Sequence, residues 1–555
     1  MPSAQLSLMR DAEGVVTFFV TANLFVTPSP QVRSGPMSEP SVNPSVNPTV
    51  NPYDVTPYID LSYVATHPDR LATMARLLGR HPVPLERCRM LEIGCAAGGN
   101  LLPMAYSLPN AEFVGIDYSA RQIEDGKQRI QQLGFNNIRL ICADLGAMDD
   151  AFVAELGDFD YFVAHGFYSW TPPPVRDAML ALCKRVLRPN GVAYVSYNTF
   201  PGWHTLKMIR EAMLYHGQDA DSPEEKATQG REMASFLAQY ANDGLHKEVF
   251  RHYVEMLKNN LKGTDNSFLL HDELSEVNDP VYFYQFVEHA QRHGLQYLVE
   301  VELRSVLVSS FRPETQTALK TMIWDAIDLE QKMDFVRNQM FRQTLLCHAD
   351  MPLDRKITPL AVTESWLRSQ AKRVESVDAS LPAGARQFVS KDEATLTTNH
   401  PLSIAALEIL AQQWPRAIHF TELMAAARRV LGHTSANPVG AGPQEVMALA
   451  STLLRAHGQS PQLVELHSFQ PALVNRVSEK PVASKMARFE AETRTIVTNV
   501  WHDRVTLLPV QQRLVRLLDG TRKVSDLVVL MGGSVPPGEL DEHLRFFAYA
   551  GLLVA

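Results

Sequence analysis

The sequence has no excess of positive charge, no cysteine spacing typical of zinc sites and no long apolar run. Its 555 residues include 52 lysines and arginines against 61 aspartates and glutamates, which gives a net charge of −9. Overall charge therefore does not favour nucleic acid as a partner. The five cysteines are scattered and odd in number, so we expect a reducing, cytoplasmic setting and no structural metal. No run reaches the about 18 apolar residues of a membrane helix, so no membrane insertion is expected.

The first 50 residues differ in composition from the rest of the chain. An apolar stretch at 15–26 has the length of a secretory signal core, but a single base, Arg10, precedes it and no clear small-residue cleavage site follows. Val-Asn-Pro then occurs three times within 42–52. These turn formers predict a flexible N-terminal extension, residues 1–50. Met1 and Met37 both remain candidates for the translation start.

The most informative stretch, residues 90–100, reads Met-Leu-Glu-Ile-Gly-Cys-Ala-Ala-Gly-Gly-Asn. It predicts a buried strand that runs into a turn of small residues. Gly94 and Gly98 lack a Cβ, so the backbone can turn sharply there and approach a ligand closely. The next helix opens near Asn100 with Pro103 in its first turn, so its free amides face the same ligand. The stretch therefore predicts a site for an anionic group of a nucleoside cofactor.

A second predicted strand ends in an acid, Asp117, which can accept hydrogen bonds from two ribose hydroxyls. A nicotinamide dinucleotide is the first alternative, but the third glycine of Gly-x-Gly-x-x-Gly is missing. The spacing Glu92-x-Gly94-x-Ala96-x-Gly98 instead resembles motif I of the class I S-adenosylmethionine-dependent methyltransferases. That family normally has a glycine where Ala96 stands.

Later segments follow the order of the same family. A third strand ends in Ala143-Asp144-Leu145, and the resemblance implies that Asp144 contacts the adenine amino group. The apolar run 159–166 suits a central parallel strand whose end points at the active-site crevice. Strands that alternate with helices predict an α/β fold with a Rossmann-like, seven-stranded sheet. The candidate cofactor residues are Glu92, Gly94, Cys95, Ala96, Gly98, Asn100, Asp117, Tyr118, Ala143, Asp144, Leu145 and His165.

Four longer motifs, at 53–58, 67–72, 165–170 and 196–204, narrow the resemblance. They are similar to methyltransferases that carry the methyltransferase regulatory domain, of which the lysine methyltransferases of bacterial outer-membrane proteins are best defined. The resemblance spans about residues 51–555 and implies a cytosolic enzyme that uses S-adenosylmethionine to methylate lysines of a protein substrate. A small-molecule methyltransferase and a non-catalytic S-adenosylmethionine-binding regulator remain alternatives. Oligomeric state stays open.

Aromatic and histidine side chains near the predicted strand ends fit this chemistry. Methyl transfer needs a neutral nucleophile held about 3–3.5 Å from the methyl group. Ring faces can hold a lysine ammonium by cation–π attraction, and a histidine can accept its proton directly or through water. Packing against the sheet is the alternative for each ring. The candidate catalytic residues are His165, Tyr168, Trp170, Tyr197, Trp203 and His204.

The rest of the chain divides into further units. Apolar residues at helical spacing beyond residue 219 predict an inserted helical cap. The segments 271–274 and 278–283 could line the substrate entrance. Two later groups of helices with short strands predict α+β, winged-helix-like domains, whose lysines and arginines are not concentrated as DNA binding requires. The expected domains are an extension at 1–50, a methyltransferase domain at 51–352 in which 219–302 hold a helical regulatory insertion and strand 6, a linker at 353–395, and winged-helix-like domains at 396–473 and 474–555.

Overall fold

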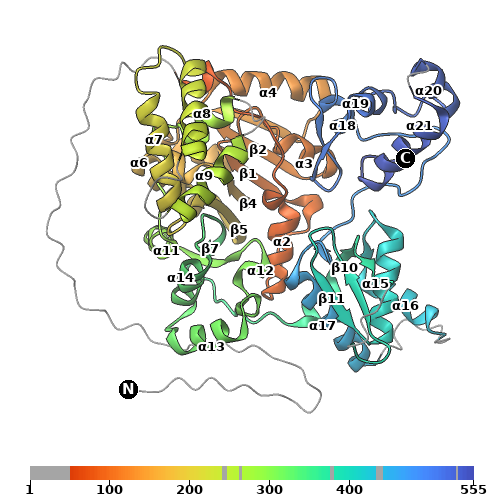
Figure 1. Cartoon of the computed structure of the whole chain (residues 1–555). Helices are drawn as coiled ribbons and strands as arrows, with labels where there is room; N and C mark the ends of the chain where they lie inside the picture. The colour runs from red at the N-terminus through yellow and green to blue at the C-terminus, as the bar shows by residue number, and fades with distance from the viewer. Residues whose placement is uncertain (1–50, 241–246, 262–265, 376–380, 433–441, 533–534) are drawn as a thin grey trace.

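The computed structural model describes residues 51–240, 247–261, 266–375, 381–432, 442–532 and 535–555. The predicted flexible extension, 1–50, lies outside these described residues. A large α/β domain occupies one side of the molecule and two smaller units occupy the other (Figure 1). In the part of the chain that is described, no helix has the length and apolar character needed to cross a membrane.

The α/β domain is built on a seven-stranded sheet with the order β3-β2-β1-β4-β5-β7-β6. Its strands are β1 (Arg89–Ile93), β2 (Glu112–Asp117), β3 (Ile138–Cys142), β4 (Phe159–Ala164), β5 (Leu187–Asn198), β6 (Leu295–Glu300) and β7 (Phe341–His348). Strand β7 runs antiparallel to both of its neighbours, whereas the other pairs are parallel. The predicted Rossmann-like, seven-stranded sheet is confirmed.

Helices cover both faces of this sheet. Successive side chains of a strand point to opposite faces, so Met90 packs in one apolar cluster and Leu91 in another. The first cluster includes α2 (Pro68–Leu77), α3 (Leu101–Ser107) and α4 (Ala120–Leu133). The second includes α5 (Asp150–Leu156), α6 (Pro173–Val186) and α11 (Phe283–Arg292). Burial on both faces explains why the central strands are apolar throughout.

The chain between β5 and β6 is helical, as the stripes predict. It forms α7 (Trp203–His216), α8 (Pro223–Tyr240), α9 (Lys247–Leu261), α10 (Asn266–Phe268) and a π-helical turn (Leu269–Glu273). These helices share an apolar cluster of their own, which includes Ile209, Met213, Val254 and Leu257. Between β6 and β7 lie α12 (Leu303–Val306), α13 (Pro313–Met322) and α14 (Ala326–Arg337).

The prediction of a linker at 353–395 is wrong, because this range contains strands. It holds β8 (Trp366–Arg368), β9 (Lys372–Arg373) and β10 (Arg386–Val389), and β11 (Thr395–Thr398) begins at its end. Strand β8 is the centre of a small sheet with β12 (Ile418–His419) and β13 (Glu465–His467), and Leu367 is fully buried there. Helices α15 (Pro401–Gln413), α16 (Phe420–Val430) and α17 (Pro443–Gln459) complete this middle domain.

The last unit has its own core, with Leu514, Leu527, Leu544 and Phe547 among its buried residues. It consists of α18 (Lys485–Glu490), a hairpin of β14 (Ile496–Thr498) and β15 (Arg504–Thr506), and helices α19 (Pro509–Val515), α20 (Val524–Leu530) and α21 (Pro537–Tyr549). The tip of the hairpin, residues 499–503, points away from this core and reaches the other two domains.

A buried ionic junction joins the three domains. Asp69 of α2 accepts from His467 of β13 at 2.6 Å. Arg368 of β8 is 2.7 Å from Glu465 and 3.1 Å from Asp503 of the hairpin tip. Charged groups removed from water need such partners. The conspicuous motif at 67–72 thus serves to dock the C-terminal units.

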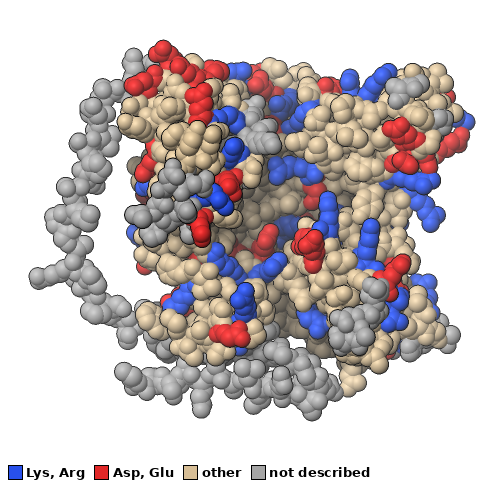
Figure 2. Space-filling view, viewed as in Figure 1, with Lys and Arg blue, Asp and Glu red and all other residues tan. Residues whose placement is uncertain are grey.

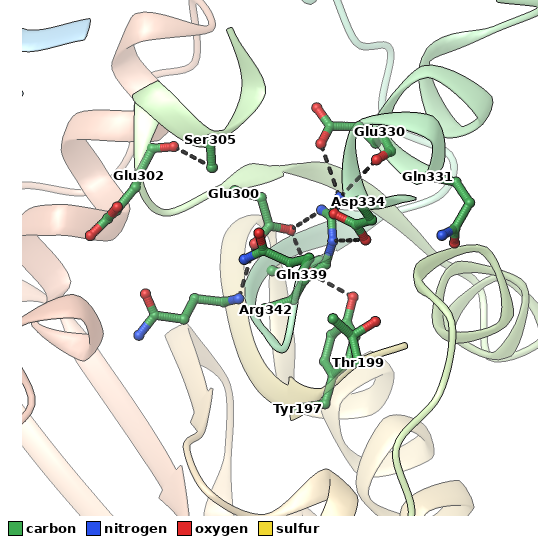
Figure 3. A network of polar contacts seen from close by, with 12 residues as sticks. Tyr197, Thr199, Glu300, Glu302, Ser305, Glu330, Gln331, Asp334, Gln339 and Arg342 are labelled. Carbon is green, nitrogen blue, oxygen red and sulfur yellow. Dashed lines mark hydrogen bonds and ion pairs between the residues drawn. The ribbon is translucent and has the colours of Figure 1, made fainter. Parts of the chain in front are cut away.

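A second buried network lies between β6, β7 and α14 (Figure 3). Arg342 lies 2.8 Å from both Glu300 and Asp334 and 3.2 Å from Glu330. Thr344 donates to Glu300 at 2.6 Å and shares a hydrogen bond with the hydroxyl of Tyr197. One guanidinium thus faces three carboxyl groups. Burial raises the pKa of Glu330 to about 7 and that of Asp334 to about 6, against the opposing attraction of Arg342.

We predict that Glu330→Gln flattens the pH dependence of stability. An acid with a raised pKa in the fold favours the folded state fully below its unfolded pKa, and this contribution is lost as pH rises through the folded value, here between about 4.5 and 7. The free energy of unfolding of the variant should therefore fall less between pH 5 and pH 8, by on the order of 1–3 kcal/mol. Urea denaturation at both pH values measures it.

Glu288→Gln, at an exposed position on α11, is the matched control. It should follow the wild type at both pH values. A Glu330→Gln protein that lost as much stability as the wild type would contradict the assignment of Glu330 as a buried acid that resists ionisation.

Candidate functional site

A cavity of about 590 Å³ opens at the carboxyl ends of β1, β2 and β4. Strand β1 lies between β2 and β4, so the strand order reverses at this point, which is where open α/β sheets bind their ligands. Gly94, Asp117 and His165, which follow or end these strands, lie on its wall. The volume lies within the range of pockets that hold a small ligand.

The turn after β1 has a backbone that side chains rarely permit. Gly94 and Gly98 have φ of +72° and +78°. A Cβ on Gly94 would lie 3.0 Å from the ring of Phe167, and one on Gly98 would lie 3.2 Å from Leu140. Ala96 also has a left-handed φ, 49°, which costs an alanine roughly 1 kcal/mol. This conformation explains why the family it resembles prefers glycine at that position.

Asp117 holds the turn in place from the end of β2. One carboxylate oxygen accepts the amide of Ala96 at 2.9 Å and the other accepts the amide of Ser119 at 2.8 Å. Burial raises the pKa of this carboxyl although both amides oppose the shift. Each carboxylate oxygen can accept more than one hydrogen bond, so the group can still receive ligand hydroxyls.

Asn100 connects the cavity to distant parts of the chain. Its amide nitrogen donates to Glu92 at 2.7 Å and to Thr66 at 2.9 Å. Its amide oxygen accepts from the backbone of Tyr63 and lies 2.9 Å from Nε2 of His502 at the hairpin tip. The second oxygen of Glu92 is buried and has no partner among the described residues, and burial raises the pKa of Glu92 to about 8. A ligand ammonium would satisfy that oxygen.

The predicted cofactor residues lie together. Those on the cavity wall are Glu92, Gly94, Cys95, Ala96, Asn100, Asp117, Tyr118, Ala143, Asp144, Leu145 and His165. Gly98 is not among the lining residues, because it faces Leu140 under the turn. The contacts of each with a cofactor stay predictions.

Two of the predicted catalytic residues, His165 and Trp170, also line the cavity. Nδ1 of His165 lies 2.9 Å from the hydroxyl of Tyr194 and 3.3 Å from that of Ser196. Burial lowers the pKa of His165 to about 4, so the ring is neutral at pH 7 and a weak base. The indole of Trp170 donates to the backbone oxygen of Asp272 at 3.3 Å.

Tyr168 and Tyr197 are not on the cavity wall, which corrects their expected placement. Both rings pack on the other side of the sheet, against α11. The hydroxyl of Tyr168 is 2.8 Å from Nδ1 of His289, and the ring of Tyr197 stacks on Phe286 at 4.1 Å. Each is almost fully buried by apolar neighbours. Their position is that of core residues with satisfied hydroxyls.

Trp203 and His204 also lie away from the cavity. The chain turns after β5 and carries both residues into the first turn of α7. Trp203 is buried there, and His204 stacks on Phe200 at 4.1 Å and lies 3.1 Å from the hydroxyl of Tyr282. The turn at 199–202 therefore removes them from the strand end where they were expected.

The structure adds residues that were not among the predicted site residues. The segment after residue 50 covers the cavity with the rings of Tyr53, Tyr58 and Tyr63. Tyr53 stacks on His271 at 4.3 Å, and the hydroxyl of Tyr58 donates to Asp272 at 3.2 Å. The motif at 53–58 contributed to the family resemblance. No hydrophobic periodicity in this segment could predict that it covers the cavity.

The cavity is acidic and aromatic. Among the residues described, no lysine or arginine lines it. Burial lowers the pKa values of His165 and His271, so neither ring adds positive charge at pH 7. The acidic side chains on its wall are Asp60, Glu92, Asp117, Asp144 and Asp272. This arrangement favours cationic ligands.

Away from the cavity, one cluster has the composition of a metal site. Nε2 of His289 and of His293 lie 2.8 and 2.9 Å from the same oxygen of Asp177. These hydrogen bonds satisfy the three side chains without an ion.

Three families match parts of the chain. The family described as a methyltransferase domain matches residues 85–242, and the predicted methyltransferase regulatory domain matches 265–348, which extends beyond the insertion expected at 219–302. The family described as the PKMT C-terminal winged helix domain matches 479–543.

Proteins that are similar over most of the chain support the same family. Uncharacterized protein RP789 of Rickettsia prowazekii is 33% identical over 499 residues, which cover 88% of this chain and 87% of the relative. A solved structure, PKMT2 from Rickettsia typhi, has a TM-score of 0.76 at 28% identity and covers 90% of this chain and 100% of its own. A second structure of PKMT2, in complex with AdoHcy, has a TM-score of 0.77 at 26% identity.

We predict that Asp117→Ala weakens binding of AdoHcy at least tenfold. The variant loses the acceptor at the end of β2 and also frees the amide of Ala96, which shapes the turn beside the ligand. Isothermal titration with AdoHcy measures the effect. Asp149→Ala, which removes an exposed helix cap outside the cavity, is the control and should bind normally. Equal affinity of both variants would remove Asp117 from the site.

Proposed function

Because the chain belongs to the class I S-adenosylmethionine-dependent methyltransferases that carry a methyltransferase regulatory domain, we propose that it transfers methyl groups to lysine side chains of a protein substrate. Its cofactor is S-adenosylmethionine. The likeness to PKMT2, whose abbreviation stands for protein lysine methyltransferase, supports a lysine acceptor. The free cysteines of the described chain suit a reducing, cytoplasmic setting.

The cavity residues fit this cofactor group by group. The unpartnered oxygen of Glu92 would bind the ammonium of its methionine part. Asp117 would accept the two ribose hydroxyls, and Asp144, exposed after β3, would accept the adenine amino group. When bound, the cofactor supplies a methyl group from a sulfonium centre.

The observation that carries the lysine proposal is the charge of the cavity. Acidic and aromatic side chains line it and, within the described chain, no basic ones do. A lysine ammonium is attracted by both kinds of group. An anionic acceptor, such as a carboxylate metabolite or a nucleic-acid phosphate, would find no basic side chain among the described residues of the wall.

The shape of the molecule supports a large substrate. Figure 2 shows a hollow in one face, between the α/β domain and the two C-terminal units, with lysines and arginines along its border. A hollow between domains gives a polypeptide several surfaces to contact. The C-terminal domains are accordingly proposed to dock the protein substrate rather than DNA.

The purified chain should transfer label from methyl-labelled S-adenosylmethionine to the protein fraction of a bacterial extract, and the label should map to lysine. Asp117→Ala should abolish transfer. Label found only in the small-molecule fraction would replace the proposal with an amine-methylating enzyme. Binding of S-adenosylmethionine without any S-adenosylhomocysteine formed would favour a regulator.

We also predict that Trp170→Ala lowers the rate of protein methylation at least tenfold while the affinity for AdoHcy changes less than about twofold. The indole forms part of the cavity wall next to Asp272, and its face would hold the ammonium. Initial rates and titration measure the two effects. Trp324→Ala, at a position 83% exposed, is the control. Equal loss of rate and affinity would make Trp170 a wall of the cofactor site.

A further inference from the structure

The cavity holds an acid to which the proposed cofactor contacts assign no role. Asp272, in the π-helical turn of the regulatory segment, lines the wall and accepts from the hydroxyl of Tyr58 at 3.2 Å. Its backbone oxygen is fixed by Trp170 at 3.3 Å and by Asn278 at 3.0 Å. No basic residue of the described chain is among the groups that shift its pKa, which are burial, Glu273 and Tyr58. A carboxylate buried with only a phenol as partner is poorly stabilised.

Aromatic rings connect this acid to the strand ends. Tyr63 packs on His165, which follows β4, with ring centres 4.1 Å apart. Tyr58 lines the same cavity and donates to Asp272 at 3.2 Å, and burial, followed by Asp272 and Tyr63, raises its pKa. Together with Trp170, these rings form an aromatic wall that leads from the turn of the cofactor site to a carboxylate.

The other acids of the cavity are already committed. Glu92 is bonded to Asn100 within the motif I turn, and Asp117 accepts two backbone amides. Asp60 pairs with Arg129 and accepts the amide of Gly99. Asp144 is exposed and caps a helical turn. The remaining oxygen of Glu92 is assigned to the ammonium of the cofactor, so Asp272 is the acid on the wall that is left for the ammonium of a substrate.

We propose that Asp272, held by Tyr58, binds the ammonium of the target lysine and accepts its proton before methyl transfer. The inference rests on the proposed function and adds the residue that prepares the nucleophile. The proton moves from the ammonium nitrogen to a carboxylate oxygen of Asp272, which leaves a neutral amine. The amine lone pair forms the new carbon–nitrogen bond while the carbon–sulfur pair returns to sulfur. Asp272 then releases its proton to water.

The electrostatics suit this role. Burial, with a smaller contribution from Glu273, raises the pKa of Asp272 to about 7, and the Tyr58 hydrogen bond opposes the shift. Tyr53 and Tyr63 also face it and stay neutral, since burial raises the pKa of each to about 12. A base is most effective when its pKa is near the working pH. His165, with a pKa of about 4, is a weaker acceptor.

The test compares the pH profiles of three proteins, using initial rates of label transfer to the protein fraction of the extract. The wild-type rate should rise through about pH 7 and then level off. Asp272→Asn should be at least 100-fold slower at pH 7.5, and its rate should keep rising toward the pKa of free lysine, near 10.4. Tyr58→Phe should shift the wild-type rise to higher pH, because it removes a donor that favours the carboxylate.

Two further measurements separate this role from a structural one. Asp272→Asn should bind AdoHcy within about twofold of the wild type and keep its melting temperature. n-Butylammonium, which copies the end of a lysine, should raise the melting temperature of the AdoHcy-bound wild type but not of that variant. Glu276→Gln, exposed in the same segment, should behave as wild type in every assay.

The outcomes are distinguishable. If the wild type labels lysine and Asp272→Asn keeps its rate and pH profile, the inference is wrong and the proposed function stands. Loss of AdoHcy binding in Asp272→Asn would instead assign Asp272 to the cofactor site and overturn the inference. If the wild type labels no protein lysine, the proposed function fails, and the inference fails with it.

Discussion

The cofactor cavity depends on the side-chain amide of Asn100. Its nitrogen donates to Glu92 and Thr66, and its oxygen receives the backbone of Tyr63 and the ring of His502. Both donors and both lone pairs of the amide are therefore used. The four partners come from β1, from the segment that covers the cavity and from the C-terminal hairpin. The partners of Asn100 thus come from two domains, the α/β domain and the C-terminal unit, although the sheet alone carries motif I.

This arrangement places buried carboxyl groups without a basic partner around the cavity. The second oxygen of Glu92 has no partner among the described residues, and burial raises the pKa values of Glu92 and Asp272 to about 8 and 7. Each buried carboxyl group resists ionisation until a cation arrives. A cationic ligand therefore favours the ionised form of these carboxyl groups, and its binding stabilises the fold in return.

The sequence predicted those parts of the site whose residues lie close together in the chain. Small residues after a strand and an acid at the end of the next strand have direct physical meaning, so the turn at 94–98 and Asp117 were found. Tyr168 was misplaced because it begins a single 3₁₀ turn, Tyr168–Trp170, in which neighbouring residues face different directions. Trp170 faces the cavity and Tyr168 faces the core, and no pattern of three residues distinguishes them.

The remaining errors concern partners that are distant in the chain. Strand β8 was taken for part of a linker because its three residues gain their stability from β12 and β13, about 50 and 100 positions later. Tyr58 and Asp272 are separated by 214 positions, yet they meet on the cavity wall. Propensity and periodicity describe neighbours in sequence, so they cannot detect such pairs. The family resemblance gave the segment at 271–274 a possible place at the substrate entrance, but it did not pair Asp272 with Tyr58.

A comparison with the other buried acids of this fold supports the role proposed for Asp272. Glu300, Glu330 and Asp334 surround Arg342, and that guanidinium reduces the cost of burying them. The carboxylate of Asp272 is half-buried and meets the phenol of Tyr58 instead of a base, while the side chains of Trp170 and Asn278 donate to its backbone oxygen. The buried carboxyl groups around Arg342 are thus paired with a cation that the fold itself supplies. Asp272 has no such cation among the described residues, which agrees with the proposed binding of a ligand ammonium beside the aromatic wall.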